Sequence, residues 1–389
     1  MFAMPTLPIE LITEILLRLP VKSLLQFRSV SKSWFTLISS AEFVKTHLNI
    51  SGKKYNVILT GLINAFTSRE TQYVLRDYSL SSLCNDDCVI EAFDLDYPMS
   101  SPQQYVSIVG SVNGLICLMI NEVDLVLWNP SIRKFKKLPD SRLKDKVTGG
   151  NQCDIPKGVC VVYGFGYDES SDDYKVVGCI EDRINLVPQA EVEIYSLKSD
   201  SWRSKDDVLD GVLLSKPCKC VNGKLHWINN NNDSNIISFD LADEKWGKVE
   251  LPRYREGDLF LDLKVLGSDL CVFCNYMEIH ADVWVMRDYG VKESWTKMYS
   301  VKYPDRFFSP FISRTLFMSN KGEVLLVPGS TLMVHNPEDE PIIYPKVTNF
   351  DFCVAMNIYI ESLVSPPLLN ELSKAAKAQM NDNNAADDL

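Results

Sequence analysis

Apolar residues recur with two different periods along this chain, and the change falls near residue 50. Before that point they follow the i, i+3, i+4, i+7 period of an amphipathic helix: Ile12, Ile15, Leu16 and Leu19. Thr6 is the expected N-cap of this helix, Pro8 fits its first turn and Pro20 ends it. Two further short helices are predicted, one that contains Leu24, Leu25 and Arg28 and one that starts near Ser31.

From about residue 55 the apolar runs become short, and turn residues separate them at close intervals. Val, Ile, Tyr, Phe and Trp, which favour strands, are frequent in these runs. The runs begin at Tyr55, Gln72, Gly114, Asp124, Val159, Tyr174, Ala190, Gly223, Asn235, Asp269, Ala281, Glu323 and Cys353. The pattern predicts a mainly β fold made of many short antiparallel strands.

The strand pattern also repeats along the chain. Glycines beside strands lie 50, 59, 44 and 55 residues apart: Gly114, Gly164, Gly223, Gly267 and Gly322. Pairs of aromatic residues keep the same rhythm, with Trp284/Trp295 four residues longer than the others: Trp128/Phe135, Tyr195/Trp202, Phe239/Trp246 and Trp284/Trp295. A period near 50 with an aromatic in each hairpin is typical of kelch-like β-propeller blades. The residues from 55 to 366 then form about six degenerate blades.

The last apolar run, from Cys353 to Val364, is expected to close the ring. A propeller commonly hides its open edges by pairing its last strand with its first blade, so this run should pair near residues 55–62. The residues after 366 are polar and should fray. The predicted units are a helical module at 1–48, a propeller at 49–366 and a disordered tail at 367–389.

Composition narrows the class of protein. Of the 389 residues, 46% are apolar, so the chain can bury a core. The net charge of −11 argues against non-specific nucleic-acid binding, which needs a strong cationic field. No apolar run approaches the roughly 20 residues that span a bilayer, and no signal peptide is predicted. We expect a cytoplasmic or nuclear protein whose eleven irregularly spaced cysteines are mostly buried thiols.

The charge is divided unevenly between the two predicted modules. Residues 1–50 hold five Lys and Arg against three acids, a net of +2, so the remainder carries −13. Three helices in about 40 residues bury too little surface to be stable alone. Their apolar stripe should be covered by a partner, by the rest of the chain or by both, and a groove on a partner would hold it through anchors at helical spacing.

Residues that could support catalysis are few and poorly spaced. No two histidines have a metal-ligand spacing: His47, His226, His280 and His335. The closest cysteine pairs match no usual zinc spacing and lie in strand-like runs, which favours buried thiols: Cys218 with Cys220, and Cys271 with Cys274. The Gly-Phe-Gly segment at residue 164 lacks the third glycine and the following helix of a phosphate-binding loop. We predict no catalytic residue, metal or cofactor.

The order of residues in the helical module resembles the F-box family. Leu-Pro at residues 7–8 opens the first helix, LPVKSLL makes the turn, and RSVSKSW, up to Trp34, builds the last helix. One departure is Ser31, where many members have Cys. The resemblance covers about residues 5–45.

The rest of the chain resembles the F-box-associated region of plant F-box/kelch-like proteins, the group that includes the S-locus F-box proteins. The segments that carry the resemblance are GLICL at Gly114, LWNPSIRKFKKLP at Leu127, YGFGYDESSDDYKVV at Tyr163, EIYSLKSDSWR at Glu193, VNGKLHW at Val221, WVMRDYGVKESW at Trp284 and IYIESLV at Ile358. Together the two resemblances imply a non-catalytic substrate receptor of an SCF-type ubiquitin ligase. Its F-box would dock a Skp-type adaptor, and through it a cullin scaffold, while the propeller captures a protein substrate for degradation.

The residues expected to meet the adaptor are apolar residues of the F-box, some of which must pack inward: Leu7, Pro8, Ile15, Leu16, Leu19, Pro20, Val21, Leu24, Leu25, Val30 and Trp34. The resemblance implies an acidic adaptor, which the +2 balance suits. The substrate and its binding residues are unknown, and longer insertions are candidates: 141–156, 182–189, 229–235 and 253–258. No nucleic-acid or membrane partner is expected.

Two alternatives to a degradative receptor stay open. A propeller enzyme, such as a hydrolase or oxidase, would need acids or metal ligands that converge at the channel of the ring. An F-box interaction scaffold would bind partners without degrading them.

Overall fold

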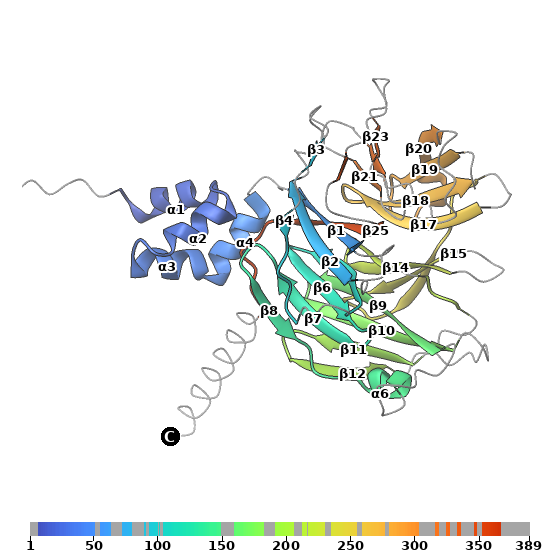
Figure 1. The fold of residues 1–389 in the computed structure, drawn as a ribbon, viewed down its shortest axis with the longest axis horizontal. Helices are drawn as coiled ribbons and strands as arrows, with labels where there is room; N and C mark the ends of the chain where they lie inside the picture. The colour runs from blue at the N-terminus through green and yellow to red at the C-terminus, as the bar shows by residue number, and fades with distance from the viewer. Residues whose placement is uncertain are drawn as a thin grey trace, which may run out of the picture.

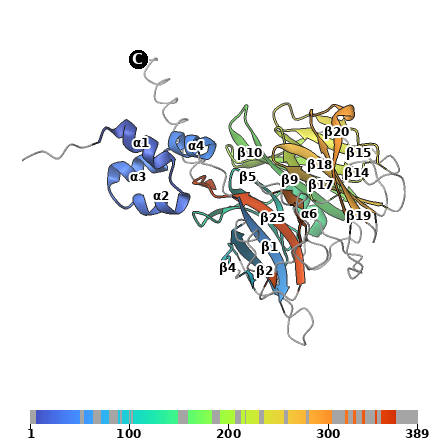
Figure 2. The same ribbon diagram turned by 90° about the horizontal axis from the view of Figure 1, so that it is seen from above.

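The computed structural model describes residues 7–50, 55–63, 72–79, 89–90, 93–99, 101, 104–148, 159–182, 191–205, 212–215, 217–229, 235–254, 259–276, 280–302, 316–318, 324–326, 333–335, 346–347 and 352–366. Four short helices project from one side of a ring of small β-sheets (Figures 1 and 2). The fold is mainly β, as predicted. Within the described ranges, no helix has the length and apolar character needed to cross a membrane.

The helical module has one helix more than predicted. It consists of α1 (Ile9–Leu17), α2 (Val21–Phe27), α3 (Lys32–Ser39) and α4 (Ala41–Ile50). The sequence analysis missed α4, in which apolar residues alternate with polar neighbours. Pro8 occupies the N-cap position of α1, one residue before the first turn in which it was expected. Thr6, the predicted N-cap, lies outside the described residues.

Four blades are antiparallel sheets whose strands follow one another in chain order. Their strands are β5 (Val106–Val112), β6 (Leu115–Ile120), β7 (Asp124–Asn129) and β8 (Lys134–Lys137); β9 (Val159–Asp168), β10 (Asp173–Asp182), β11 (Val192–Ser196) and β12 (Ser201–Lys205); β13 (Lys219–Val221), β14 (Lys224–Asn229), β15 (Asn235–Asp240) and β16 (Trp246–Val249); and β17 (Leu259–Leu266), β18 (Asp269–Tyr276), β19 (His280–Met286) and β20 (Trp295–Lys302). A helix, α6 (Arg142–Thr148), separates the first two blades, and a short 3-10 helix, η1 (Lys292–Ser294), precedes β20.

Three further sheets complete the described part of the ring. A four-stranded sheet has the order β25-β1-β2-β4, a three-stranded sheet has the order β21-β22-β23, and β3 pairs with β24 in parallel. Their strands are β1 (Tyr55–Ile63), β2 (Gln72–Ser79), β3 (Val89–Ile90), β4 (Phe93–Asp94), β21 (Leu316–Met318), β22 (Val324–Leu326), β23 (Met333–His335), β24 (Lys346–Val347) and β25 (Phe352–Ile360). Five four-stranded sheets and one three-stranded sheet agree with the prediction of about six blades.

The ring closes through the pairing of the last strand with the first, as predicted. β25 runs antiparallel to β1, with Tyr55 opposite Ile360 and Leu62 opposite Phe352. The register shifts once, between Thr60 and Gly61. β1 then has a partner on both sides, so it leaves no open edge to pair with another chain, and β25 becomes the edge strand of this sheet.

The predicted aromatic pairs sit in the outer hairpins of the blades. Trp128 faces Phe135, Tyr195 faces Trp202, and Phe239 faces Trp246 across neighbouring strands. The fourth pair differs, because the register shifts beside Trp284 and the longer connection moves Trp295 away. Trp284 faces Lys297, and Trp295 faces Met286.

The main core lies between neighbouring blades. Gly164 and Gly166 on β9 are packed so closely against the next blade that a Cβ at Gly164 would lie 2.7 Å from a ring atom of Trp227. Side-chain packing thus accounts for the Gly-Phe-Gly segment, which lies within a strand. Trp227 and Phe239 are fully buried in the same cluster.

Candidate functional site

The helical module folds around a small apolar core of its own. Its buried members are Leu16, Leu17, Val21, Leu24, Ile38, Phe43 and Leu363. All four helices contribute to this cluster. Leu363 lies in the segment that follows β25, so the end of the propeller completes the core of the helices.

The connections between the helices are fixed locally. Pro20 precedes α2 with φ near −63°, the value that a proline ring imposes. Ser31 caps α3, because its Oγ accepts a hydrogen bond of 3.2 Å from the backbone N–H of Trp34. Arg28 donates from Nη2 to the carbonyl of Ile38 at 3.5 Å, which ties the end of α2 to α3. Burial lowers the pKa of the Arg28 guanidinium.

The eleven residues predicted to meet an adaptor fall into three groups. The exposed ones are Leu7, Pro8, Ile15, Pro20 and Val30. Leu19, Leu25 and Trp34 are partly buried. Leu16, Val21 and Leu24 are at most 3% exposed and pack inward, so in this structure they support the helices rather than face outward. A role in adaptor binding stays a prediction for the outward-facing residues.

Four exposed apolar residues of the helical module were missed by the sequence analysis. Ile9, Leu11, Phe35 and Ile50 are 51%, 48%, 55% and 56% exposed. Leu11 and Ile15 are four residues apart on α1 and therefore lie on one face of that helix, away from its buried Leu16 and Leu17. The sequence did contain a signal for this exposed apolar surface. α1 is apolar around most of its circumference, whereas a helix that packs on one side needs only one apolar stripe.

The helical module also has a continuous basic segment. Between residues 15 and 41 the chain has four Lys or Arg and no acid. Arg18, Lys22 and Lys32 are exposed. Exposed cations beside apolar side chains favour a partner with an acidic surface, because complementary charge speeds association and selects the partner.

α4 mounts the helical module on the propeller. On one side, Phe43 belongs to the helical core, and His47 lies 2.9 Å through Nε2 from the carbonyl of Leu19. On the other side, Val44 and Leu48 pack against the core between the β5–β8 and β9–β12 blades. This missed helix therefore holds both modules together.

The segment after β25 forms a second mount. Nδ2 of Asn129, at the end of β7, lies 2.8 Å from the carbonyl of Val364 and 3.0 Å from both the carbonyl and Oγ of Ser362. Gly114 in the β5–β6 turn has φ of +79°, and a Cβ there would lie 2.7 Å from the carbonyl of Ile360. Glycine is required at this position, both for the backbone conformation and for the close approach of the segment.

Four of the groups considered for catalysis are buried in the propeller, whereas Cys220 and His280 are partly exposed there: the four are Cys218, His226, Cys271 and Cys274. His226 lies on β14, as predicted, with Nε2 2.7 Å from the Tyr289 hydroxyl. Burial lowers its pKa to about 4, against weaker opposing hydrogen bonds. Burial also raises the pKa of the Cys271 thiol, and that of Cys274 to about 12, so neither is a thiolate at neutral pH. The described residues contain no group of three or more His, Cys, Asp or Glu that could hold a metal ion.

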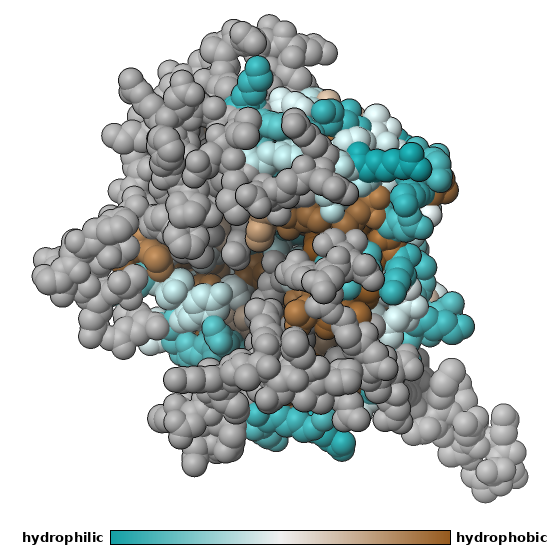
Figure 3. Space-filling model, turned by 90° about the vertical axis from the view of Figure 1, so that its right-hand side faces the viewer, coloured by the Kyte–Doolittle hydropathy of each residue, from teal (hydrophilic) through white to brown (hydrophobic). Residues whose placement is uncertain are grey.

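The candidate substrate loops lie largely outside the described residues. Only α6, within the 141–156 insertion, and the ends of the other three insertions are described. Figure 3 shows the face of the molecule turned away from the helical module. Apolar residues gather toward its middle, and hydrophilic residues lie around them on several sides, most of them on the right of this view (Figure 3).

Comparison with known proteins assigns both modules. Residues 4–46 match the F-box domain, and residues 71–365 match the F-box associated beta propeller domain. The chain is 32% identical to the F-box/kelch-repeat protein At3g23880 of Arabidopsis thaliana, over 94% of this chain and 97% of that protein. It is also 32% identical to the F-box protein CPR1 of Arabidopsis thaliana, over 85% and 82% of the two chains. Among solved structures, the Dos1 propeller covers 77% of this chain and 69% of its own, at 10% identity and a TM-score of 0.37. The chain therefore belongs to the F-box proteins that carry an F-box associated beta propeller domain.

Proposed function

We propose that this protein is the substrate-recognition subunit of an SCF-type ubiquitin ligase. Its F-box docks a Skp-type adaptor, and through it a cullin scaffold, while the propeller captures a protein for ubiquitination and proteasomal degradation. The exposed apolar residues of the F-box carry this proposal. Leu7, Leu11, Ile15, Val30 and Phe35 stay about half exposed or more in a module whose core is already complete. Apolar surface of this kind marks a protein interface.

The mounting of the F-box supports the same role. A receptor must hold its substrate at a defined position relative to the ligase. The α4 contacts and the Asn129 hydrogen bonds fix the F-box against the propeller through buried groups. A substrate on the propeller would then keep a nearly constant position relative to a bound adaptor.

The role places no chemical demand on this chain, because ubiquitin transfer is performed elsewhere in such an assembly. The buried, protonated thiols of Cys271 and Cys274 accord with a receptor rather than a ubiquitin-transferring enzyme. We place the protein in the cytoplasm or the nucleus, where ubiquitin ligases of this type would meet their substrates.

Adaptor binding is tested with two matched variants of the full chain. Val30→Asp places a charge on the F-box surface, and Val291→Asp makes the same change at an exposed site before η1. Binding to a purified Skp-type adaptor from Arabidopsis thaliana is measured by calorimetry. We expect at least tenfold weaker binding for Val30→Asp and wild-type affinity for Val291→Asp, since interface anchors carry on the order of 2 kcal/mol each. Equal affinities for the two variants would sink the docking assignment.

Degradation is tested separately from docking. Proximity labelling in plant cells, with and without a proteasome inhibitor, identifies partners of the wild type and of Val30→Asp. A substrate should accumulate when the proteasome is inhibited, and also when Val30→Asp replaces the wild type. Partners whose abundance responds to neither change would instead indicate a scaffold that does not degrade what it binds.

A further inference from the structure

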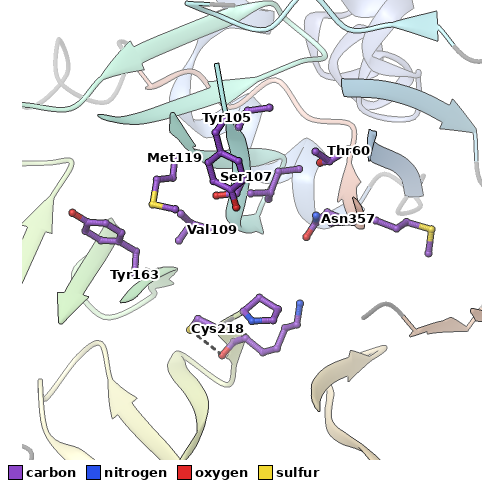
Figure 4. A pocket seen from close by; sticks show the side chains of 14 residues that line it. Thr60, Tyr105, Ser107, Val109, Met119, Tyr163, Cys218 and Asn357 are labelled. Atoms are coloured by element: carbon purple, nitrogen blue, oxygen red, sulfur yellow. Dashed lines mark hydrogen bonds between the residues drawn. The ribbon is translucent and has the colours of Figure 1, made fainter. Parts of the chain in front are cut away.

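A cavity of about 170 Å³ lies at the centre of the ring, where the inner strands of four blades converge (Figure 4). Four blades contribute their edge strands to the wall of the cavity: β25, β5, β9 and β13. Each of these strands, or the residues that immediately precede it, lines the cavity. An engineered cavity of about 150 Å³ in another protein holds benzene. The space at the centre of this ring therefore suffices for a ligand built on a single ring.

The wall combines apolar surface with one polar group that has no hydrogen-bond partner. Val109 and Met119 supply apolar surface. Thr60 and Asn357 lie on one side of the cavity, and Tyr163 lies across from them in Figure 4. Thr60 is 2% exposed, and its hydroxyl has no hydrogen-bond partner. A buried hydroxyl without a partner is costly, and a polar atom of a ligand would relieve that cost.

The wall also contains Lys219, at the start of β13. The sulfur atoms of its neighbours, Cys218 and Cys220, lie against glycines of β9. Because side chains alternate along a strand, Lys219 faces the opposite way, toward β17.

On β17, Asp262 and Lys264 form an ion pair of 2.7 Å, and both are under 10% exposed. The negative charge of Asp262 is thus already matched. Burial, and then repulsion by Lys264, lowers the pKa of Lys219 to about 8, while Asp262 and Cys218 oppose the shift. No ion pair joins Lys219 to any residue that the structure describes, so this group of three has one positive charge in excess.

We propose that the central cavity binds a small organic monoanion, a carboxylate whose apolar body is about one ring in size. The carboxylate would neutralise Lys219, which a partly dehydrated cation strongly favours. The Thr60 hydroxyl would donate to the ligand, and Val109 and Met119 would contact its apolar body. Bound in this position, the anion would bridge the inner strands of four blades. The inference is independent of adaptor docking, since no cavity residue belongs to the F-box.

The first experiment uses the wild-type full chain and two probes of the same shape. Sodium benzoate and neutral benzamide are titrated into the protein at pH 7 by calorimetry. We expect saturable binding of benzoate and at least tenfold weaker binding of benzamide. Absence of saturable benzoate binding up to about 10 mM, or equal binding of both probes, would overturn the proposal.

The second experiment assigns the site with variants. Lys219→Met should weaken benzoate binding at least tenfold, and the isosteric Thr60→Val should weaken it several-fold. Lys248→Met, at an exposed position on β16, changes the net charge equally and should leave the affinity unchanged. Each variant is first shown to have the circular dichroism spectrum and the melting temperature of the wild type. A folded Lys219→Met that binds benzoate like the wild type would also refute the proposed site.

Discussion

The two modules of this protein treat apolar side chains in opposite ways. Of the eleven large apolar residues that are exposed in the described part of the chain, seven lie in residues 7–50, and four are spread over the whole propeller. The propeller places its apolar residues between blades, where neighbouring sheets cover one another. The F-box completes its core and still exposes Leu11, Ile15 and Phe35 on its surface.

The hydrophobic effect therefore has two roles in this chain: it holds the blades together, and it attaches the F-box to other surfaces. Blade packing stabilises the ring internally, so its surface is free to be polar and acidic. The F-box is too small to cover its own apolar surface, and it relies on the propeller on one side and, as we propose, on an adaptor on the other. Substitutions in the two modules should therefore differ in what they impair, and the following changes test this.

The largest expected change in stability distinguishes core residues of the F-box from surface residues. Leu24→Ala removes a fully buried side chain and should lower the free energy of unfolding of this module by about 2–5 kcal/mol. Ile15→Ala removes a side chain that is 53% exposed and should cost no more than about 0.5 kcal/mol. Hydrogen exchange of residues 7–50 measures both changes.

The same two variants separate stability from docking. Ile15→Ala should weaken adaptor binding although the module stays folded. If Leu24→Ala and Ile15→Ala reduced amide protection equally, the distinction between the core and the surface would be wrong.

An intermediate effect is expected in the core of the propeller, and it depends on pH. His226 stays neutral when folded down to its pKa of about 4, whereas an unfolded histidine binds a proton near pH 6.5. The unfolded state thus gains protons first, so this group's contribution is complete above about pH 6.5 and is lost as the pH falls toward 4. The loss should amount to on the order of 3 kcal/mol.

Urea midpoints between pH 7 and pH 4, for the wild type and for His226→Gln, measure this contribution. The variant should lose less stability on acidification than the wild type. Lys248→Gln, at an exposed position on β16, replaces no histidine; it is the control and should retain the wild-type slope. Parallel pH profiles for the wild type and His226→Gln would refute the assignment.

The smallest effect is expected at the junction of the two modules. Lys45 on α4 and Asp172 beside β10 lie 3.2 Å apart, and their side chains are 59% and 55% exposed. Exposed ion pairs contribute about 0.2–1 kcal/mol. Lys45→Ala should therefore change the melting temperature only slightly, with adaptor affinity unchanged. A loss well above 1 kcal/mol would show that charge, rather than the apolar contacts of Val44 and Leu48, holds the modules together.

The sequence predicted the propeller well because its signals are local and repeated. The strand period, the glycine spacing and three of the aromatic pairs each report on a hairpin, and a hairpin is set by nearby residues. The pairing of β25 with β1 followed from the need to hide a sheet edge. The Trp284 hairpin departs from the pattern for two reasons. Its longer connection is visible in the sequence, but the register shift beside Trp284 is not, because the apolar pattern of the strand does not reveal it.

The F-box was predicted less completely. The direction in which its side chains point, and its attachment to the propeller, depend on residues that are distant in the sequence. Helical spacing identified Leu16 and Ile15 together, but it could not tell that one points inward and the other outward. α4 was missed because Val44 and Leu48 pack against the core of the propeller, and this contact cannot be recognised from the residues around them in the sequence. The roles of Leu363 and Asn129 at the junction likewise arise from contacts across more than 200 residues.

The closure of the ring by β25 has a consequence for synthesis on the ribosome. The F-box leaves the ribosome first, yet β25 and Leu363, which complete the first blade and the F-box core, are made some 300 residues later. At about 5–20 residues per second, the nascent chain carries an unpaired β1 edge for tens of seconds. A message broken before codon 352 would yield an F-box attached to an open ring. In such a product the β1 edge that β25 covers stays open, where it can pair with another chain.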